Sequence, residues 1–103
     1  MKLKFYPVER LKKEILEIVS RYLDLKEYKV FFFGSRVSDK VNERSDIDIG
    51  IEGPKPISLE IMAEIKEDIS NLSTLYHIDV VDFSDVDKDF YKVAKQKIEL
   101  ITL

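Results

Sequence analysis

The stretch from Val30 to Glu52, VFFFGSRVSDKVNERSDIDIGIE, holds two short apolar runs separated by a polar segment. The first run, residues 30–33, combines a β-branched residue with three aromatic residues, which is typical of a short strand buried on both faces. The second run, residues 47–52, alternates between apolar and other residues and predicts a second strand. A Gly-Ser pair ends the first strand and an Asp-x-Asp sequence opens the second, so the chemistry is expected at these strand ends.

Further elements flank these two strands. Apolar residues recur at helical spacing over residues 8–24 and 59–73, and Ser58 is placed as the N-cap of the second of these helices. The run IDVVDF at residues 78–83 predicts a third strand.

The C-terminal part begins with a capping pattern at residues 84–87, and helical spacing then continues to Ile98. The last residues, 97–103, either extend this helix or fold back as a short edge strand, and the pattern leaves both open. The element order is α-β-β-α-β-α. It predicts an α/β (α+β) fold, with a small mixed sheet flanked by helices, in one domain spanning residues 1–103.

Composition narrows the class of protein. No apolar run approaches the roughly 18 residues of a membrane span, and the N-terminal segment lacks the apolar core of a secretory signal. The absence of cysteine excludes disulfides, thiolate metal sites and cysteine nucleophiles. We therefore expect a cytoplasmic protein. The 17 basic residues are scattered among 20 acidic ones, which argues against broad nucleic-acid binding but allows a local cationic pocket for a nucleotide.

The Asp-x-Asp sequence is a candidate metal site. Successive strand side chains point to opposite faces, so Asp46 and Asp48 share one face while Ile47 and Ile49 face the core. Two carboxylates held this close repel each other unless a cation lies between them. Mg²⁺ prefers oxygen ligands, and a pair of such ions about 3.5–4 Å apart can assist phosphoryl transfer.

The Gly-Ser pair is a candidate phosphate site. A glycine just past a strand end lets the backbone turn sharply and approach a ligand closely. The hydroxyl of Ser35 adds a donor, and a helical turn beginning there would direct its N–H groups at anionic oxygens. Arg36 is placed to reach the same phosphates.

The third strand offers two further acids, Asp79 and Asp82. They are three residues apart and face opposite sides of a regular strand, so only one can join the first pair. His77, the only histidine, either contacts a substrate or simply begins a strand at the surface. Arg44 either holds a phosphate or fixes Asp46 by a salt bridge. The phenylalanines of residues 31–33 fit core packing better than stacking on a base.

The segment GSRVSDKVNERSDIDIGIE resembles the signature of the nucleotidyltransferase superfamily that includes DNA polymerase beta. It is most similar to the minimal nucleotidyltransferases, or MNT proteins, which are encoded beside partners with a HEPN domain. The family pattern is Gly-Ser, a spacer of about ten residues, Asp-x-Asp, and a third acid on a later strand. This chain matches it throughout, including Arg44-Ser45-Asp46 before the second strand. In relatives the third acid stands early in its strand, which corresponds to Asp79.

The resemblance implies a Mg²⁺-dependent enzyme that transfers AMP from ATP to a hydroxyl. Two Mg²⁺ ions would be bound by the three carboxylates, and the third would also help to deprotonate the acceptor. The triphosphate would be bound near the Gly-Ser turn. The residues implied for the metal ions are Asp46, Asp48 and Asp79, and those implied for the nucleotide are Gly34, Ser35, Arg36 and Ser45.

The resemblance also implies a partner. In the MNT family the acceptor is a tyrosine of a HEPN RNase toxin, and the MNT protein acts as the antitoxin, so a hetero-oligomer is expected. Two alternatives remain open at this point. One is an antitoxin that neutralises by binding alone, with a vestigial site. The other is a small-molecule nucleotidyltransferase, against which the absence of a second domain counts.

Overall fold

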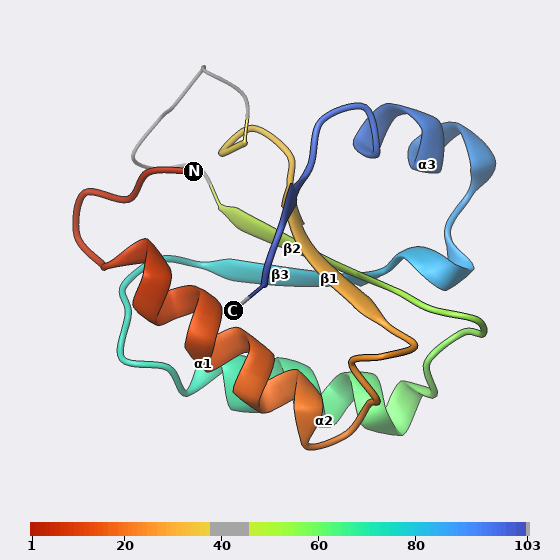
Figure 1. The fold of residues 1–103 in the computed structure, drawn as a ribbon, viewed down its shortest axis with the longest axis horizontal. Helices are drawn as coiled ribbons and strands as arrows, with labels where there is room; N and C mark the ends of the chain where they lie inside the picture. The colour runs from red at the N-terminus through yellow and green to blue at the C-terminus, as the bar shows by residue number, and fades with distance from the viewer. Residues whose placement is uncertain (38–45, 103) are drawn as a thin grey trace.

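The computed structural model describes residues 1–37 and 46–102, and within them a mixed four-stranded sheet forms the centre (Figure 1). The strand order is β3-β2-β1-β4. β1 runs antiparallel to both β2 and β4, whereas β2 and β3 are parallel. The strands are β1 (Lys29–Phe33), β2 (Ile47–Glu52), β3 (Ile78–Asp82) and β4 (Glu99–Leu100). The predicted α/β class with a small mixed sheet is confirmed.

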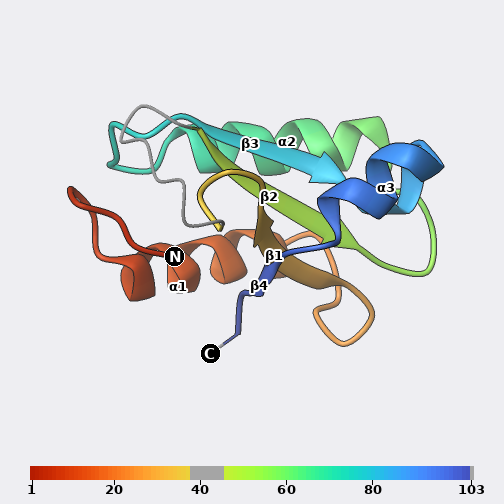
Figure 2. The ribbon, with the colours of Figure 1, turned by 90° about the horizontal axis from the view of Figure 1, so that it is seen from above.

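The helices cover both faces of this sheet. They are α1 (Val8–Ser20), α2 (Leu59–Ser70) and α3 (Lys88–Ala94), with a short 3-10 turn η1 (Phe83–Asp85) after β3. In Figure 1, α1 and α2 lie below the sheet and α3 lies above it. Seen from above, α2 follows the β3 edge and α1 lies on the side of β1 and β4 (Figure 2). Helix α2 connects β2 to β3, which is the kind of crossover that a parallel pair requires.

Strand β1 is buried on both faces, as its composition predicted. Val30 and Phe32 belong to the large core beneath the sheet, which α1 and α2 complete. Phe31 and Phe33 belong to a smaller aromatic cluster with Phe83, on the side of α3. The rings of Phe31 and Phe33 each pack edge-on against Phe83 at centroid distances of 4.9 Å. Aromatic pairs prefer this geometry.

All three helices differ at their ends from the sequence prediction. The first two helices stop at Ser20 and Ser70, short of the predicted residues 24 and 73. The last helix begins at Lys88 and ends at Ala94, so its predicted extension to Ile98 is wrong.

The two ends of this last helix have separate causes. At the start, the Asp82 carboxylate accepts from Ser84 N, so Ser84 and Asp85 of the predicted capping pattern belong to η1, while Asp87 is the N-cap residue of α3. At the other end, Glu99 and Leu100 pair with the open edge of β1, which settles the alternative that the sequence left open. The predicted Ser58 cap is confirmed, because its hydroxyl accepts from Ile61 N at 3.2 Å.

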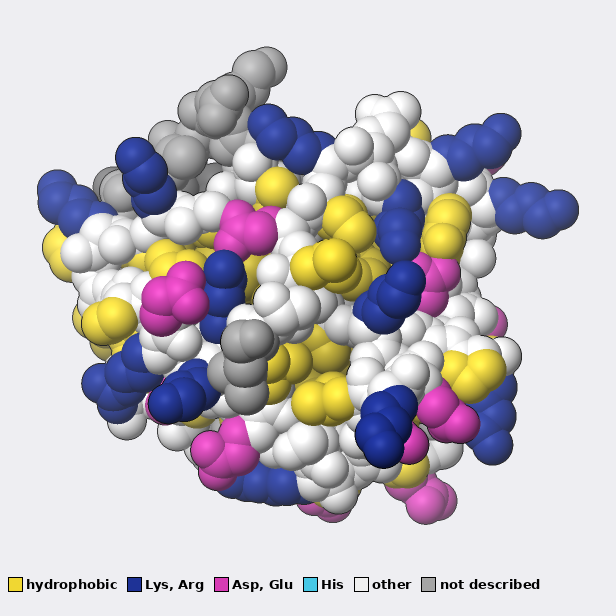
Figure 3. Space-filling model, in the orientation of Figure 1, with side chains coloured by type: hydrophobic (Ala, Val, Ile, Leu, Met, Phe, Trp, Pro, Cys, Tyr) yellow, Lys and Arg dark blue, Asp and Glu magenta, His cyan; other side chains and the backbone are white. Residues whose placement is uncertain are grey.

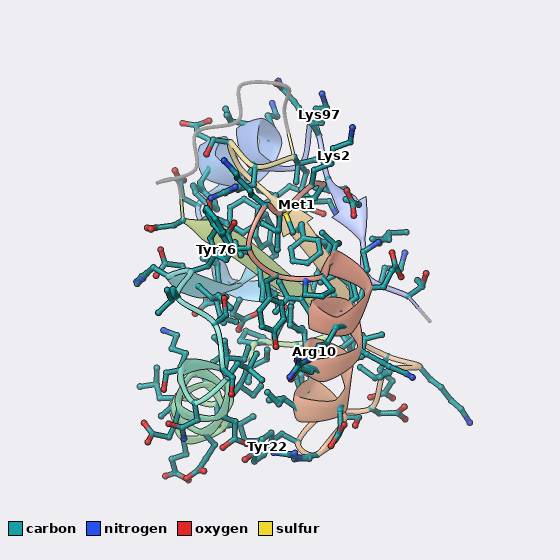
Figure 4. The ribbon with its side chains drawn as sticks, turned by 90° about the vertical axis from the view of Figure 1, so that its left-hand side faces the viewer. Met1, Lys2, Arg10, Tyr22, Tyr76 and Lys97 are labelled. Atoms are coloured by element: carbon teal, nitrogen blue, oxygen red, sulfur yellow. The ribbon has the colours of Figure 1, made fainter. Side chains whose placement is uncertain are left out.

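Polar contacts join the layers. Glu52, at the end of β2, accepts hydrogen bonds from Tyr91 Oη at 2.6 Å and Lys95 Nζ at 2.7 Å, which fastens α3 to the sheet. Tyr22, labelled at the foot of Figure 4, donates to Asp68 and joins the end of α1 to α2.

Two features of the helices and the surface bear on function. No helix in the described residues is both long enough and apolar enough to cross a membrane. On the face drawn in Figure 3, Lys and Arg side chains are scattered among acidic and apolar ones.

Candidate active site

The parallel pairing of β2 with β3 brings the predicted acids together. Asp48 pairs directly with Asp79, so their side chains lie on the same face of the sheet, next to each other on adjacent strands. One row earlier, Ile47 N donates to the backbone oxygen of His77 at 2.9 Å and extends the register beyond the strands. Asp46 therefore lies beside His77. The result is two rows of two side chains, Asp46 with His77 and Asp48 with Asp79.

This face is the one that carries the aromatic cluster. Asp48 pairs with Phe33 across the β1–β2 ladder, and paired residues in an antiparallel sheet point to the same side. Ile47 and Ile49, which alternate with the acids, are both fully buried on the opposite side. The alternation predicted from the sequence is thus confirmed, and the acids lie where β1 ends and β2 and β3 begin.

Gly34 provides the close approach of the turn to these acids. Its φ is +82°, a conformation that L side chains rarely adopt. A Cβ at this position would lie 2.3 Å from Oδ2 of Asp48, so only glycine allows the turn to run against the carboxylate. Gly34 O then accepts from Val37 N at 3.1 Å, which closes a single turn. Gly34 and Ser35 are both exposed and border a cavity of about 360 Å³ beneath α3.

The electrostatics of the acids indicate a site for cations. Burial raises the pKa of Asp48 above its ordinary value, and repulsion from the carboxylates of Asp79 and Asp46 raises it further. The positive charge that His77 can carry opposes the shift weakly. A divalent ion between the carboxylates would remove this repulsion. The donor set, the shared face and the close glycine turn therefore fit oxygen-coordinated Mg²⁺.

His77 lies nearer to the acids than its sequence position indicated. Its Nε2 is 3.4 Å from Oδ1 of Asp79. One ligand atom from each of Asp46, His77 and Asp79 lies within 4.8 Å of the other two. The residue is exposed and precedes the strand, as predicted, but it also belongs to the acidic cluster. Its spacing of two from Asp79 is the sequence signal that places it on the same face.

Arg36, two residues after Gly34, is buried. Its side chain is only 1% exposed, and its guanidinium lies 4.9 Å from the ring centroid of Tyr76. Figure 4 labels Tyr76, which stands just before His77 in the chain. The stacking links the Gly-Ser turn to the segment that enters β3.

Asp82 lies outside the cluster. Its carboxylate accepts from Ile57 N at 2.7 Å and from Ser84 N at 2.9 Å, so it holds two loops at the far end of β3. The prediction that only one of Asp79 and Asp82 can join the first pair is consistent with this placement. Arg44 and Ser45 lie outside the described residues.

Comparison of the sequence with known proteins shows which family the chain matches. A family model described as polymerase beta nucleotidyltransferase matches residues 13–102. A curated relative from Haemophilus influenzae, named "Probable protein adenylyltransferase MntA", is 30% identical over 88 residues, which is 84% of this chain and 77% of the relative.

A solved structure gives a second point of comparison. It is described as "Crystal structure of the toxin-antitoxin with AMP-PNP" and matches with a TM-score of 0.71, over 88% of this chain and 72% of that chain. The sequence identity is 15%, so this likeness establishes the fold alone.

Proposed function

The chain belongs to the polymerase beta nucleotidyltransferase family and is a nucleotidyltransferase, and from this premise we propose that it transfers AMP from ATP to a hydroxyl of a partner protein. The observation that carries the proposal is the pairing of Asp48 with Asp79 beside Gly34, which puts carboxylates and a close backbone turn at one spot. The relative named as a protein adenylyltransferase supports AMP as the group and a protein as the acceptor.

Each residue of the cluster has a proposed part. Asp46, Asp48 and Asp79 would bind two Mg²⁺ ions, and Asp79 would also draw the proton from the acceptor hydroxyl. Gly34 and Ser35 would bind the terminal phosphates through a backbone N–H and a hydroxyl. Ser45, which precedes the first acid, would join them.

Arg36 was expected to bind the same phosphates. Its burial against Tyr76 favours a different part, in which it holds the Gly-Ser turn in place from behind.

Bound Mg²⁺ would neutralise charge on the triphosphate and on the attacking oxygen. The chain itself contributes position: the acids are fixed by the β2–β3 ladder and the turn is fixed against Asp48. The hydroxyl oxygen attacks the α-phosphorus, the bond from that phosphorus to the β-phosphate oxygen breaks, and pyrophosphate leaves. Positioning and charge stabilisation account for most of the rate in such a reaction.

The proposed partner is a toxin with a HEPN domain, modified on a tyrosine, with this chain as the antitoxin in a cytoplasmic hetero-oligomer. The match to a structure described as a toxin-antitoxin supports a toxin as the partner, and the HEPN domain and the tyrosine come from the family resemblance alone. The described residues form no second domain that could hold a large acceptor, so an acceptor carried by a partner fits the site best.

The experiment is to incubate the protein with Mg²⁺, labelled ATP and the toxin encoded beside it, and to follow label and mass on the toxin. The variant Asp46→Asn with Asp48→Asn should lose transfer, while Asp89→Asn, an exposed acid in the first turn of α3, should keep it. Undiminished labelling by the double variant would remove these acids from the reaction. If the double variant still neutralises the toxin without labelling it, an antitoxin that acts by binding is favoured. Label on a small molecule alone would favour a small-molecule nucleotidyltransferase.

A further inference from the structure

His77 is held in a defined place beside the acids. It is the only histidine of the chain, and its backbone oxygen is fixed by the hydrogen bond from Ile47 N at 2.9 Å. Its side chain is 59% exposed and carries Nε2 to 3.4 Å from Oδ1 of Asp79. The imidazole therefore lies beside Asp79 with more than half of its surface open to solvent.

The spacing of the donor atoms suits a single ion. One nitrogen of His77 and one oxygen each of Asp46 and Asp79 lie within 4.8 Å of one another. In a tetrahedral zinc site with bonds of about 2.1 Å, two ligand atoms lie about 3.4 Å apart, which is also the distance from His77 Nε2 to Asp79 Oδ1, 3.4 Å. All three side chains are exposed, so small rotations bring the three atoms onto one ion.

We propose that His77 joins Asp46 and Asp79 as a ligand when this cluster binds a later transition ion such as Zn²⁺, an inference that rests on the proposed function and extends the range of ions that its metal site takes. A nitrogen ligand changes which ions the site favours. Carboxylate and water suit Mg²⁺, whereas imidazole suits Zn²⁺ and the other later transition ions. The site thus binds Zn²⁺ more tightly than three carboxylates alone would, and His77 adds little to the affinity for Mg²⁺.

Two properties of the chain make the test clean. Because the chain has one histidine, the imidazole ¹⁵N resonances belong to His77 alone. Because it has no cysteine, no thiolate competes for Zn²⁺. The whole protein is titrated with Zn²⁺ and, separately, with Mg²⁺, by calorimetry and by imidazole ¹⁵N NMR, without nucleotide.

We expect His77→Ala to weaken Zn²⁺ binding by about tenfold or more, because losing even a residue that only hydrogen-bonds to a metal ligand costs about 10–100-fold in affinity. Mg²⁺ binding should change by less than about twofold, since Mg²⁺ prefers oxygen. In the wild type, Zn²⁺ should shift the ¹⁵N resonance of one imidazole nitrogen, because that nitrogen coordinates the ion directly. His77→Asn, which keeps a polar side chain, should behave like the alanine variant, and Asp89→Asn should keep both affinities. Thermal melts confirm that each variant folds.

Different failures have different meanings. If His77→Ala binds Zn²⁺ as tightly as the wild type, or if the imidazole resonances do not move at saturation, the inference is overturned while the carboxylate site and the proposed transfer stand. If the wild type binds neither ion, the metal site itself is overturned, and with it both this inference and the proposed function.

Discussion

Replacing Gly34 with alanine is expected to disable transfer while leaving the protein largely folded. The residue has a φ of +82°, and an L side chain in this region costs about 1–2 kcal/mol. The new Cβ would also lie 2.3 Å from Oδ2 of Asp48, where ordinary contacts begin at 3.4 Å. That oxygen is the end of a side chain, so the carboxylate yields and the backbone stays. The free energy of unfolding should therefore fall by only the backbone cost.

The effect on activity should be much larger. The Asp48 carboxylate must retreat by about 1 Å to restore an ordinary contact, and a misplacement of that size can cost about 10²-fold in rate. The assay is AMP transfer to the toxin partner, with urea unfolding of the same preparation. In an Asp48→Ala background there is no carboxylate for the new Cβ to displace. Adding Gly34→Ala should then lower the free energy of unfolding by the backbone cost alone.

Gly53→Ala is the matched control. Its Cβ would lie 2.2 Å from the ring of Tyr28, so it should also lower stability. Gly53 follows the far end of β2, about 16 Å along the strand direction from Asp48 at about 3.3 Å per residue. The rate per folded molecule should therefore stay close to that of the wild type. A Gly34→Ala protein with wild-type transfer would show that the turn need not meet the carboxylate, and the reasoning from close approach would fail.

Two further predictions concern stability. Ser58→Ala removes the cap on Ile61 N, and it should lower the free energy of unfolding by about 1 kcal/mol in urea titrations with no change in transfer; an unchanged urea midpoint would contradict this. Burial alone would raise the pKa of Glu52, but the hydrogen bonds from Lys95 and Tyr91 outweigh it and lower that pKa. A lowered folded pKa means that the contribution of this carboxylate is full above its unfolded pKa and is lost as pH falls through the folded pKa. Urea midpoints measured from about pH 6 to about pH 3 should therefore fall less steeply for Glu52→Gln than for the wild type, and parallel curves would contradict the assignment.

The parts of the fold that depend on short-range pattern were predicted well. The composition of residues 30–33 demands burial on two faces, and the alternation in residues 47–52 assigns each side chain to a face. Both features follow from the period of a strand, which a sequence displays directly. The Ser58 cap is similarly local, because donor and acceptor lie within one turn. The ends of the helices were predicted less well, because packing and competing pairings, such as that of β4 with β1, decide where a helix stops.

In the candidate site, too, local features were predictable from the sequence and long-range features were not. That Asp46 and Asp48 share a face is local, but the register that sets Asp48 against Asp79 joins strands separated by a helix, and no periodicity encodes it. The family resemblance selected Asp79 over Asp82, and the ladder supplies the physical reason.

His77 and Arg36 show what remains beyond a sequence pattern. Both are polar residues next to motif residues, and the sequence predicted a phosphate contact for Arg36 while it left the role of His77 open. The register of β2 with β3 places His77 among the acids, whereas the turn after Gly34 directs Arg36 inward against Tyr76. Proximity along the chain therefore predicted the region of the acidic cluster, and pairing between strands is what brings His77 beside the acids.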